Sequence, residues 1–381
     1  MNSKIYEILR REKSRQFKTA ELIASENFAS QSVRELCGSV FTNKYAEGYP
    51  GARYYNGCEH MDEIETLAQN LAQQLFRTAY SNVQLHSGAN ANTAVYQAFL
   101  KPGDSILGMD LAAGGHLSHG AAVNISGKIY NATAYGVDSS GWIDYNRVQD
   151  LAKLHRPKII VAGASAYPQQ IDWKKIKTIA DSVNAYFVAD IAHYSGLIAG
   201  GAYDSPVDYA DVVTSTTHKT LRGPRGGMIL WNNPEYTKRI NSAVFPGTQG
   251  GPLMNMVAAK AQCFSEALEK TFPAYANSVV ENAKIMCEVF CANNIEVQTG
   301  GTASHIVLLN LARENISGRA AADLLESQGI TVNKNSVPGD CRSFQETSGI
   351  RLGTAAETTR GRNSTWFRNT AQRISDIIKS R

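Results

Sequence analysis

Lys219 lies in the segment DVVTSTTHKTLRGPRGG, residues 211–227, where an apolar β-type run leads into a hydroxyl-rich turn and then a loop rich in glycine and proline. A lysine just past a strand end lies at the edge of a parallel sheet where ligands bind. Its amine forms a Schiff base with an aldehyde only when partly deprotonated, which requires burial or cationic neighbours such as Arg222 and Arg225. A surface lysine in a polar turn is the alternative, and the context favours the nucleophile.

A second apolar run, in AYFVADIAHYSG at residues 185–196, ends in Asp190, and His193 follows three residues later. A carboxylate at this point can pair with a protonated pyridine nitrogen, which keeps a cofactor ring able to accept electrons from a carbanion. An aspartate that caps the following turn is the alternative. Because Asp190, His193 and Lys219 follow neighbouring strand ends, we favour the cofactor interpretation.

Two glycine-rich stretches are candidates for holding a phosphate. A strand predicted at 82–85 leads through Ser87, Gly88 and Ala89 into a helix, and small residues let the N–H groups at a helix start approach an anion. The second stretch, FPGTQGGP at 245–252, offers further N–H donors or is a simple turn. Neither stretch decides the matter alone, because many strand-to-helix turns are rich in glycine and serine for steric reasons.

Arg351 lies in the small-residue β-type segment SGIRLGT. A guanidinium in such a tight setting can hold a carboxylate through two parallel hydrogen bonds. An ordinary salt bridge is the commoner explanation for an isolated arginine of this kind. Both interpretations stay open from this motif alone.

Two segments near the amino terminus, ELIASENF at 21–28 and NKYAEGYPGARYYNGCEH at 43–60, are dense in Tyr, Glu, Ser and Gly. They lack the apolar periodicity of a core element, so they are either functional loops or solvated surface. Glu47 is a candidate proton shuttle. In GGHLSHG, His116 and His119 lie three residues apart, but no Cys or carboxylate completes a ligand set, and we predict no metal site.

The elements that must position these residues are visible as alternating patterns. Between about residues 60 and 231, short apolar β-type runs alternate with helical patterns, which predicts a mostly parallel sheet with helices on both faces. From about residue 272 a long amphipathic helix, the β-type run HIVLLNL and further helices predict a smaller α+β domain. We therefore expect an N-terminal segment at 1–60, a large α/β domain at 61–271 and a small domain at 272–381.

Composition narrows the class of protein. The 381 residues carry a formal net charge of +4 without a run of five or more basic residues, so a nucleic-acid partner is not expected. The six cysteines are scattered, with no CxxC pair, and are expected to be reduced thiols. The charged start MNSKIYEILRREKSRQFK and the lack of an apolar stretch of about 20 residues predict a cytoplasmic protein without a membrane anchor.

A series of segments in order over residues 20–362 resembles the serine hydroxymethyltransferase family. The segments are ELIASEN, TNKYAEGYPGARYY, GGHLSHG, TTHKTLRGPRGG, SAVFPGTQGGPL, ITVNKNSVP and TSGIRLGT. The resemblance implies an α/β enzyme of fold type I that uses pyridoxal 5′-phosphate (PLP), with a seven-stranded sheet in its large domain and a smaller C-terminal α+β domain. It also implies a homodimer or a dimer of dimers with active sites shared between subunits.

The resemblance assigns roles at the cofactor. Lys219 is expected to bind PLP covalently, Asp190 to pair with the ring nitrogen and His116 to stack on the ring. His193 and Ser165 would lie against the phenolic oxygen. The phosphate would be held by residues of two subunits, namely Ser87, Gly88 and His218 with Gly250 and Gly251 of the partner subunit. Further candidates at the cofactor are Ala89 and Tyr45.

The resemblance also assigns the substrate sites. The carboxylate of serine would be bound by Arg351 and Ser25, with His193 and the partner's Tyr55 nearby. Glu47 would act as acid and base between the serine hydroxyl and tetrahydrofolate. The catalytic set would be Lys219, Glu47, Tyr55, His116, Thr216 and His218. The folate site would be lined by Glu47, Tyr54, Leu111, Gly115, His116, Leu117, Asn335, Ser343, Phe344 and Gln345.

The implied reaction is the reversible interconversion of serine and glycine, with tetrahydrofolate as the one-carbon acceptor. Three departures from the family pattern keep other functions open. The chain reads GGTASH where the family reads GGTDNH, has Ser-Phe-Gln-Glu at 343–346 in place of a Pro-Phe-Val loop, and ends soon after TTRG, so we expect a shortened small domain. The alternatives are a folate-independent aldolase or transaldolase acting on β-hydroxy amino acids, and a catalytically idle PLP-binding paralogue.

Overall fold

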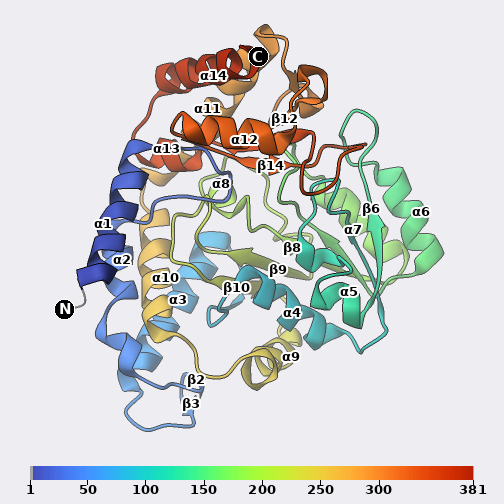
Figure 1. Cartoon of the computed structure of the whole chain (residues 1–381). Coiled ribbons are helices and arrows are strands. Elements are labelled where there is room, and N and C mark those ends of the chain that lie inside the picture. Colours follow the sequence, from blue (N-terminus) through green and yellow to red (C-terminus); the bar gives the residue numbers. More distant parts are fainter. Residues whose placement is uncertain (1–2, 381) are drawn as a thin grey trace.

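A seven-stranded sheet forms the centre of the computed structural model, which describes residues 3–380 (Figure 1). Its order is β4-β10-β9-β8-β7-β5-β6. The strands are β4 (Tyr80–Asn82), β5 (Ser105–Met109), β6 (Asn131–Tyr135), β7 (Ile159–Ala162), β8 (Tyr186–Asp190), β9 (Val212–Thr216) and β10 (Gly227–Trp231). Only β10 runs against the others, because it is antiparallel to both of its neighbours. The predicted mostly parallel sheet is confirmed.

Helices bury both faces of this sheet. Alternate residues of a strand point to opposite faces, and on β7 Ile159 and Val161 join one hydrophobic cluster while Ile160 and Ala162 join another. The first cluster includes residues of α4 (Gly88–Phe99) and α9 (Tyr236–Ser242). The second includes residues of α3 (Glu59–Phe76), α6 (Tyr145–His155), α7 (Trp173–Ser182), α8 (Ser195–Ala199) and α10 (Met254–Ala267). Burial on both faces explains why β7 and β10 are apolar along their whole length.

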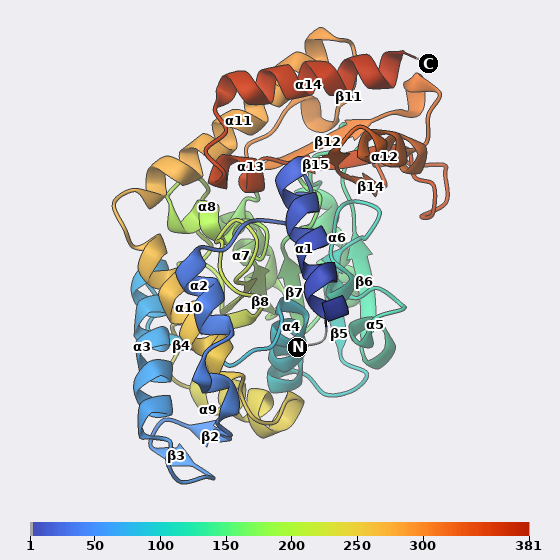
Figure 2. The ribbon, with the colours of Figure 1, turned by 60° about the vertical axis from the view of Figure 1, so that its left-hand side comes forward.

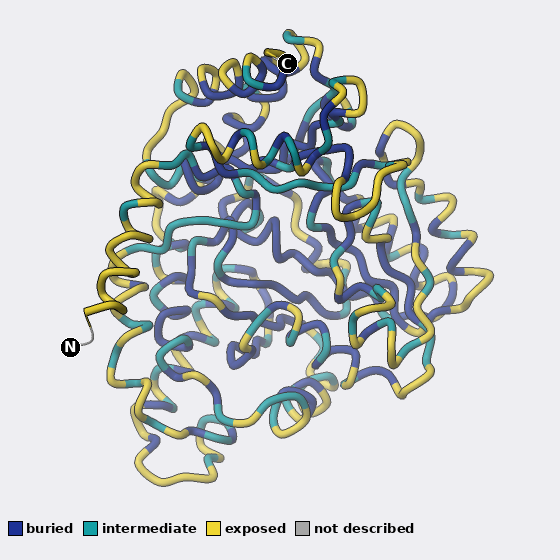
Figure 3. Tube along the Cα trace, viewed as in Figure 1, coloured by how far each residue is buried: buried dark blue, intermediate teal, exposed yellow. Residues whose placement is uncertain are grey.

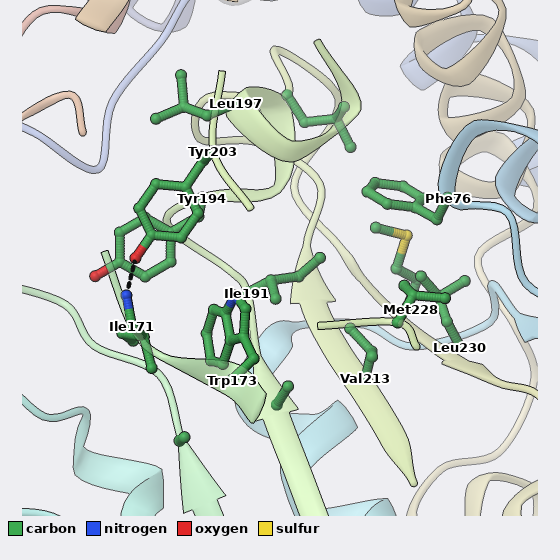
Figure 4. Packing of buried hydrophobic residues seen from close by; sticks show 14 of the residues in the cluster. Phe76, Ile171, Trp173, Ile191, Tyr194, Leu197, Tyr203, Val213, Met228 and Leu230 are labelled. Atoms are coloured by element: carbon green, nitrogen blue, oxygen red, sulfur yellow. Dashed lines mark hydrogen bonds between the residues drawn. The ribbon is translucent and has the colours of Figure 1, made fainter. Parts of the chain in front are cut away.

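Aromatic side chains of the second cluster lie beneath the segment that follows β8 (Figure 4). Tyr194 and Tyr203 stack with ring centroids 4.4 Å apart. The Tyr203 hydroxyl accepts from the Ile171 backbone N–H at 3.0 Å, and the Tyr194 hydroxyl donates to the Tyr167 carbonyl at 2.9 Å. Their polar tips are therefore satisfied inside the core, and the layer fixes the position of residue 193 next to Tyr194.

A four-stranded antiparallel sheet lies at the other end of the molecule, at the top of Figures 1 and 2. Its order is β11-β12-β15-β14, formed by β11 (Glu296–Val297), β12 (Ile306–Asn310), β15 (Gly349–Gly353) and β14 (Asn333–Asn335). It shares a core with α11 (Phe272–Ala292), α12 (Gly318–Ser327) and α14 (Ser364–Lys379). This is the α+β arrangement that the sequence predicts for the C-terminal part.

The N-terminal segment divides between the two ends of the molecule. Its first helix, α1 (Ser3–Lys18), has no buried residue and is drawn largely as exposed in Figure 3. The next strand, β1 (Ala20–Glu21), pairs in parallel with β13 (Ile330–Thr331), and Leu22 is buried in the core of the C-terminal part. Helix α2 (Gln31–Cys37) and the hairpin of β2 (Gly48–Tyr49) and β3 (Ala52–Arg53) follow. The hairpin lies at the opposite end of the molecule from α14 (Figure 2).

One strand lies earlier in the chain than predicted. The sequence predicts a strand at 82–85, but β4 spans Tyr80–Asn82, so the predicted bounds are wrong. The carbonyls of Val83 and Leu85 instead accept hydrogen bonds from the side chain of Lys260, which replaces part of the strand ladder there. Within residues 3–380, no helix combines the length and apolar character needed to cross a membrane.

Candidate active site

A cavity lies at the carboxyl ends of β8 and β9, with Lys219 in its wall. Residues from five separate segments line it, namely Gly88, Ala89, His116, His119, Ala164, Ser165, Asp190, Ala192, His193, Thr216 and Lys219. The strand ends of parallel strands meet at one edge of a sheet, which is where such folds bind ligands. The structure therefore brings together most of the residues that the sequence places at a cofactor.

Lys219 is buried, with 8% of its surface exposed. Burial lowers the pKa of its ammonium group to about 8, with Arg351 and Arg225 acting in the same direction and Asp190 opposing them. We expected Arg222 to be a second cationic neighbour of the Lys219 amine, and this expectation is wrong. Its guanidinium packs over Tyr275, 4.2 Å from the ring centroid, and so lies on the aromatic surface of α11. An amine with a pKa near 8 is nucleophilic at physiological pH.

Asp190 sits at the end of β8 and accepts three hydrogen bonds. Its Oδ2 accepts from the Asn92 amide at 2.8 Å and faces His119 Nε2 at 2.9 Å, while Oδ1 accepts from the Ala192 backbone N–H at 3.0 Å. Burial raises the pKa of Asp190, but its interactions with His119, His116 and Asn92 together outweigh burial and hold the pKa well below its usual range. The carboxylate is thus kept ionised in a buried place, as a partner for a cationic ring nitrogen must be.

The turn from β4 into α4 has the geometry of an anion cradle. Ser87 caps α4 by accepting from the Asn90 backbone N–H at 3.1 Å. A Cβ at Gly88 would lie 2.6 Å from the Thr216 methyl group, so only glycine allows this close approach to β9. The free N–H groups of the first turn remain available for a phosphate.

His218 adds an unpaired donor next to Lys219. Its Nε2 lies 3.3 Å from Arg225 Nη1, which can only donate, so the neutral ring carries its proton on Nδ1. Among the described residues this buried Nδ1 has no hydrogen-bond partner. Burial lowers the pKa of His218 to about 3, with Lys219 and Arg225 adding to the effect. An unpaired buried N–H indicates a missing acceptor, and together with Lys219, Asp190 and the anion cradle it fits a phosphorylated pyridine aldehyde.

Arg351 on β15 is the residue that the C-terminal part of the chain contributes to the site. Its Nε donates to Asn333 Oδ1 at 3.0 Å, and its Nη1 donates to the Ser165 carbonyl. Within residues 3–380 no carboxylate lies in ion-pair range of this guanidinium, so the alternative of an ordinary salt bridge is wrong. Burial lowers the pKa of Arg351 to about 10. A buried, positioned and unneutralised guanidinium is suited to an incoming carboxylate.

A second cavity adjoins the first and shares His116 and Ser165 with it. Six of the predicted folate residues line it, together with Lys334, Ser336 and Arg351; these six are Leu111, Gly115, His116, Leu117, Asn335 and Phe344. Leu111, Leu117 and Phe344 are exposed apolar side chains in this wall. Ser343 and Gln345 are exposed and are not among the lining residues. The wall combines apolar faces with polar groups, as a site for a flat heterocycle requires.

His116 lies where the two cavities meet. Its Nδ1 is 2.7 Å from the Ser118 hydroxyl, and burial lowers the pKa of its ring to about 4. Thr216 and His193 also line the first cavity, and Thr216 Oγ1 donates to the Ala192 carbonyl at 3.2 Å. A neutral imidazole above Lys219 can stack on an aromatic ring without adding positive charge.

Several predicted residues lie outside both cavities of this chain. The ring of Tyr45 is next to Gly251, and Glu47 is next to Gly250, so these four form a cluster of their own. Tyr54 and Tyr55 are exposed in the same loop, where Tyr45 and Tyr55 contact edge to face at 5.1 Å. Ser25 lines a separate hollow with His218 and Arg225. Within one chain, therefore, these residues do not meet Lys219.

Sequence reasoning missed four residues that support the site. Asn92 and His119 hold Asp190, and His305 contacts His193. Lys260 is 1% exposed and donates to the carbonyls of Val83, Leu85 and Gly227 at 2.6 to 2.9 Å. The three-residue spacing of His116 and His119 could have been used to predict that His119 supports the site. A lysine inside the apolar pattern of α10 was the signal for Lys260.

The chain was compared with known proteins. The family model described as serine hydroxymethyltransferase matches residues 1–374. A serine hydroxymethyltransferase of Nitratiruptor sp. is 54% identical over 374 residues, covering 98% of this chain and 90% of that protein. Serine hydroxymethyltransferase 1 of Pseudomonas fluorescens is 55% identical over 375 residues, covering 98% and 90%. A serine hydroxymethyltransferase of Rickettsia canadensis is 54% identical over 375 residues, covering 98% of this chain and 89% of that protein.

The match extends over both sheets and both cavities. It confirms the resemblance inferred from the motifs, and with it an α/β enzyme of PLP fold type I and a transferase that interconverts serine and glycine. Because the family model and relatives more than half identical each cover nearly the whole sequence, the chain belongs to the serine hydroxymethyltransferase family.

Proposed function

We propose that this chain interconverts serine and glycine on PLP bound covalently to Lys219, with tetrahydrofolate accepting the one-carbon unit in the adjoining cavity. The observation that carries the proposal is that a nucleophilic lysine and an ionised buried aspartate line one cavity, while Arg351, which has no carboxylate partner among the described residues, lines the cavity that adjoins it. When bound, PLP supplies an electron sink for the bond that breaks at the substrate's Cα.

Lys219 and Asp190 set the electronic state of the site. The lowered pKa of Lys219 leaves a fraction of its amine unprotonated near neutral pH, ready to attack an aldehyde. Asp190, ionised and held by Asn92 and His119, keeps the opposing ring nitrogen protonated. The phosphate would rest on the N–H groups of the turn that begins at Ser87, with the free Nδ1–H of His218 as a further donor.

Arg351 orients the amino acid. Its guanidinium is fixed by Asn333 and the Ser165 carbonyl, which leaves the remaining N–H groups to hold the substrate carboxylate bidentately. Fixing the carboxylate places the Cα bonds relative to the cofactor plane, so the bond to the hydroxymethyl group can be aligned for cleavage. Because Arg351 lines the second cavity, a substrate bound to it would lie between Lys219 and the proposed folate site.

The second cavity is the proposed folate site. Leu111, Leu117 and Phe344 present apolar side chains to the flat pterin ring, and Asn335 and the backbone around Gly115 offer polar contacts. Ser343 and Gln345 belong to the same loop as Phe344 and are proposed as rim contacts. The altered loop at 343–346 therefore changes the rim of the site and leaves the apolar wall in place.

We further propose that two copies of the chain complete each site. Glu47, Tyr45, Tyr54 and Tyr55 lie with Gly250 and Gly251 in an exposed cluster that does not reach this chain's own Lys219. Their proposed roles, an acid and base for Glu47 and carboxylate or phosphate contacts for the others, require them to enter the site of a partner subunit. Ser25 would complete its carboxylate contact in the same assembly.

The experiment is a steady-state assay of purified protein loaded with PLP. We expect glycine to form from serine in a reaction that depends on tetrahydrofolate, and Lys219→Gln to abolish it. Lys153→Gln, at an exposed lysine on α6, is the matched control and should keep full activity. Absence of glycine formation with tetrahydrofolate present would refute the proposal. Threonine cleavage that is faster than serine turnover and indifferent to tetrahydrofolate would favour the aldolase instead.

A further inference from the structure

Two buried histidines from different parts of the chain contact each other beside Lys219. Nδ1 of His193, after β8, lies 3.3 Å from Nε2 of His305, before β12. The rings are nearly parallel, with an interplanar angle of 15°. His305 is fully buried and His193 is 3% exposed. Such a contact between two imidazoles fixes which nitrogen of each ring carries the proton.

The carbonyl of Ala24 decides the protonation of His305. This oxygen lies 3.1 Å from Nε2 of His305 and can only accept. Burial lowers the pKa of His305 to about 3, with Arg351 adding to the effect, so its ring is neutral and has one N–H. That proton is on Nε2, because a lone pair there would face the carbonyl oxygen.

The opposite tautomer is disfavoured by the far side of the ring. Nδ1 of His305 is buried and has no hydrogen-bond partner among the described residues. A proton on Nδ1 would leave a buried donor unpaired, whereas a lone pair leaves only an unpaired acceptor, which proteins tolerate better. Both sides of the ring therefore favour the proton on Nε2.

The position of the proton on His305 determines which ring nitrogen of His193 carries its proton. Since Nε2 of His305 carries hydrogen, Nδ1 of His193 must accept from it. Burial lowers the pKa of His193 well below its ordinary value, so this ring is also neutral. Its single proton is then on Nε2, the nitrogen left for the cavity that His193 lines.

We propose that His305 is a positioning residue that holds His193 in the Nε2–H tautomer, so that His193 presents a hydrogen-bond donor to the bound cofactor. The consequence for the cofactor rests on the proposed function. A donor at this point stabilises an anionic ring oxygen, whereas a lone pair would repel it. The carbonyl of Ala24, which is not among the residues that line the cavity, thus determines that His193 is in its Nε2–H tautomer.

The segment that contains the Ala24 carbonyl lies directly against β15. The Gly353 backbone N–H donates to the Leu22 carbonyl at 2.8 Å. A Cβ at Gly353 would lie 2.4 Å from Cα of Ala24, so the two backbones touch at this point. β15 also carries Arg351, and the same strand therefore positions both the carboxylate-binding arginine and the tautomer of His193.

The first test needs no cofactor and no turnover. In apoprotein labelled with ¹⁵N-histidine, two-bond ¹H–¹⁵N correlation spectra distinguish the protonated from the unprotonated ring nitrogen, and His193→Asn assigns the signal. We expect His193 to be protonated on Nε2 and its Nδ1 to show the shift of a hydrogen-bonded acceptor. A proton on Nδ1 of His193 would overturn the inference, whatever the activity of the enzyme.

Two variants then test whether His305 acts as a hydrogen-bond donor or only fills space with its ring. His305→Phe keeps a planar ring without a donor, and His305→Gln keeps an N–H donor. We expect His305→Phe to remove the hydrogen-bond shift of His193 Nδ1 and to weaken PLP binding about tenfold, the effect of one lost hydrogen bond. His305→Gln should restore both. An unchanged His193 signal in His305→Phe would also overturn the inference, while loss of serine turnover with the signals as expected would count against the proposed function alone.

Discussion

His119 donates from Nε2 to Oδ2 of Asp190 across 2.9 Å, inside the wall of the cavity. The direction of this bond follows from the other ring nitrogen, because Nδ1 of His119 accepts from the backbone N–H of His116 at 3.4 Å. The proton of a neutral ring must then be on Nε2. The GGHLSHG segment thereby connects His116, which lines the cavity, to the carboxylate of Asp190 in the same wall.

His119→Phe should weaken the site through Asp190. The change removes one of the two donors to Oδ2 and leaves Asn92 as the other. We expect the pKa of Asp190 to rise and kcat to fall about tenfold, the effect of losing one hydrogen bond to a charged group. The measurements are steady-state kinetics and PLP affinity by equilibrium dialysis. His155→Phe, at an exposed histidine on α6, is the control, and equal losses in both variants would contradict the prediction.

Arg351→Lys should act mainly on substrate binding. Lysine keeps the charge but cannot make two parallel hydrogen bonds to a carboxylate, and it loses the bond to Asn333. We expect KM for serine to rise about 10- to 100-fold, with a smaller change in kcat. Arg313→Lys changes an exposed arginine and should leave KM unchanged. An unaltered KM in Arg351→Lys would show that the carboxylate is bound elsewhere.

The reaction of the apoprotein with PLP should follow the titration of Lys219. Its pKa of about 8 implies that the rate of covalent attachment rises with pH and levels off above pH 8, well below the value for an exposed lysine. Between these two values the unfolded chain binds more protons than the folded apoprotein, so the stability of the apoprotein should rise with pH in this window. Stopped-flow absorbance and urea unfolding of wild type against Lys219→Gln measure the two effects. A rate that still climbs steeply above pH 9 would exclude the lowered pKa.

Lys260→Met should destabilise the fold. Three backbone carbonyls converge on Nζ, which uses all three protons of an ammonium group, although burial lowers the pKa of this lysine to about 7. Methionine fills a similar volume and leaves these carbonyls unpaired, so we expect a loss of about 3 kcal/mol in the free energy of unfolding. PLP affinity should fall as well, because two of the carbonyls belong to the segment that leads into Ser87. Lys153→Met, on the surface of α6, is the control for urea denaturation.

The sequence alone predicted the class of fold because its signals are local. A strand buried on both faces must be apolar along its length, and the runs at β5, β7, β8, β9 and β10 show this directly. The buried residues Phe367, Ala371, Ile374 and Ile378 of α14 recur at helical spacing, which is likewise a local pattern in the sequence. The end of β4 was missed because it depends on Lys260, which is 177 residues away from Val83.

The sequence by itself determined which chemistry the protein carries, because the residue types at Lys219, Asp190 and Arg351 and the order of the family's motifs are written in the chain. Only the tertiary structure decided how those groups behave. The lowered pKa of Lys219, the ionised state of Asp190 and the lowered pKa of Arg351 all arise from burial and from neighbours distant in sequence. Electrostatic energies depend on distance and on exclusion of water, and both are set when the strands and loops pack together.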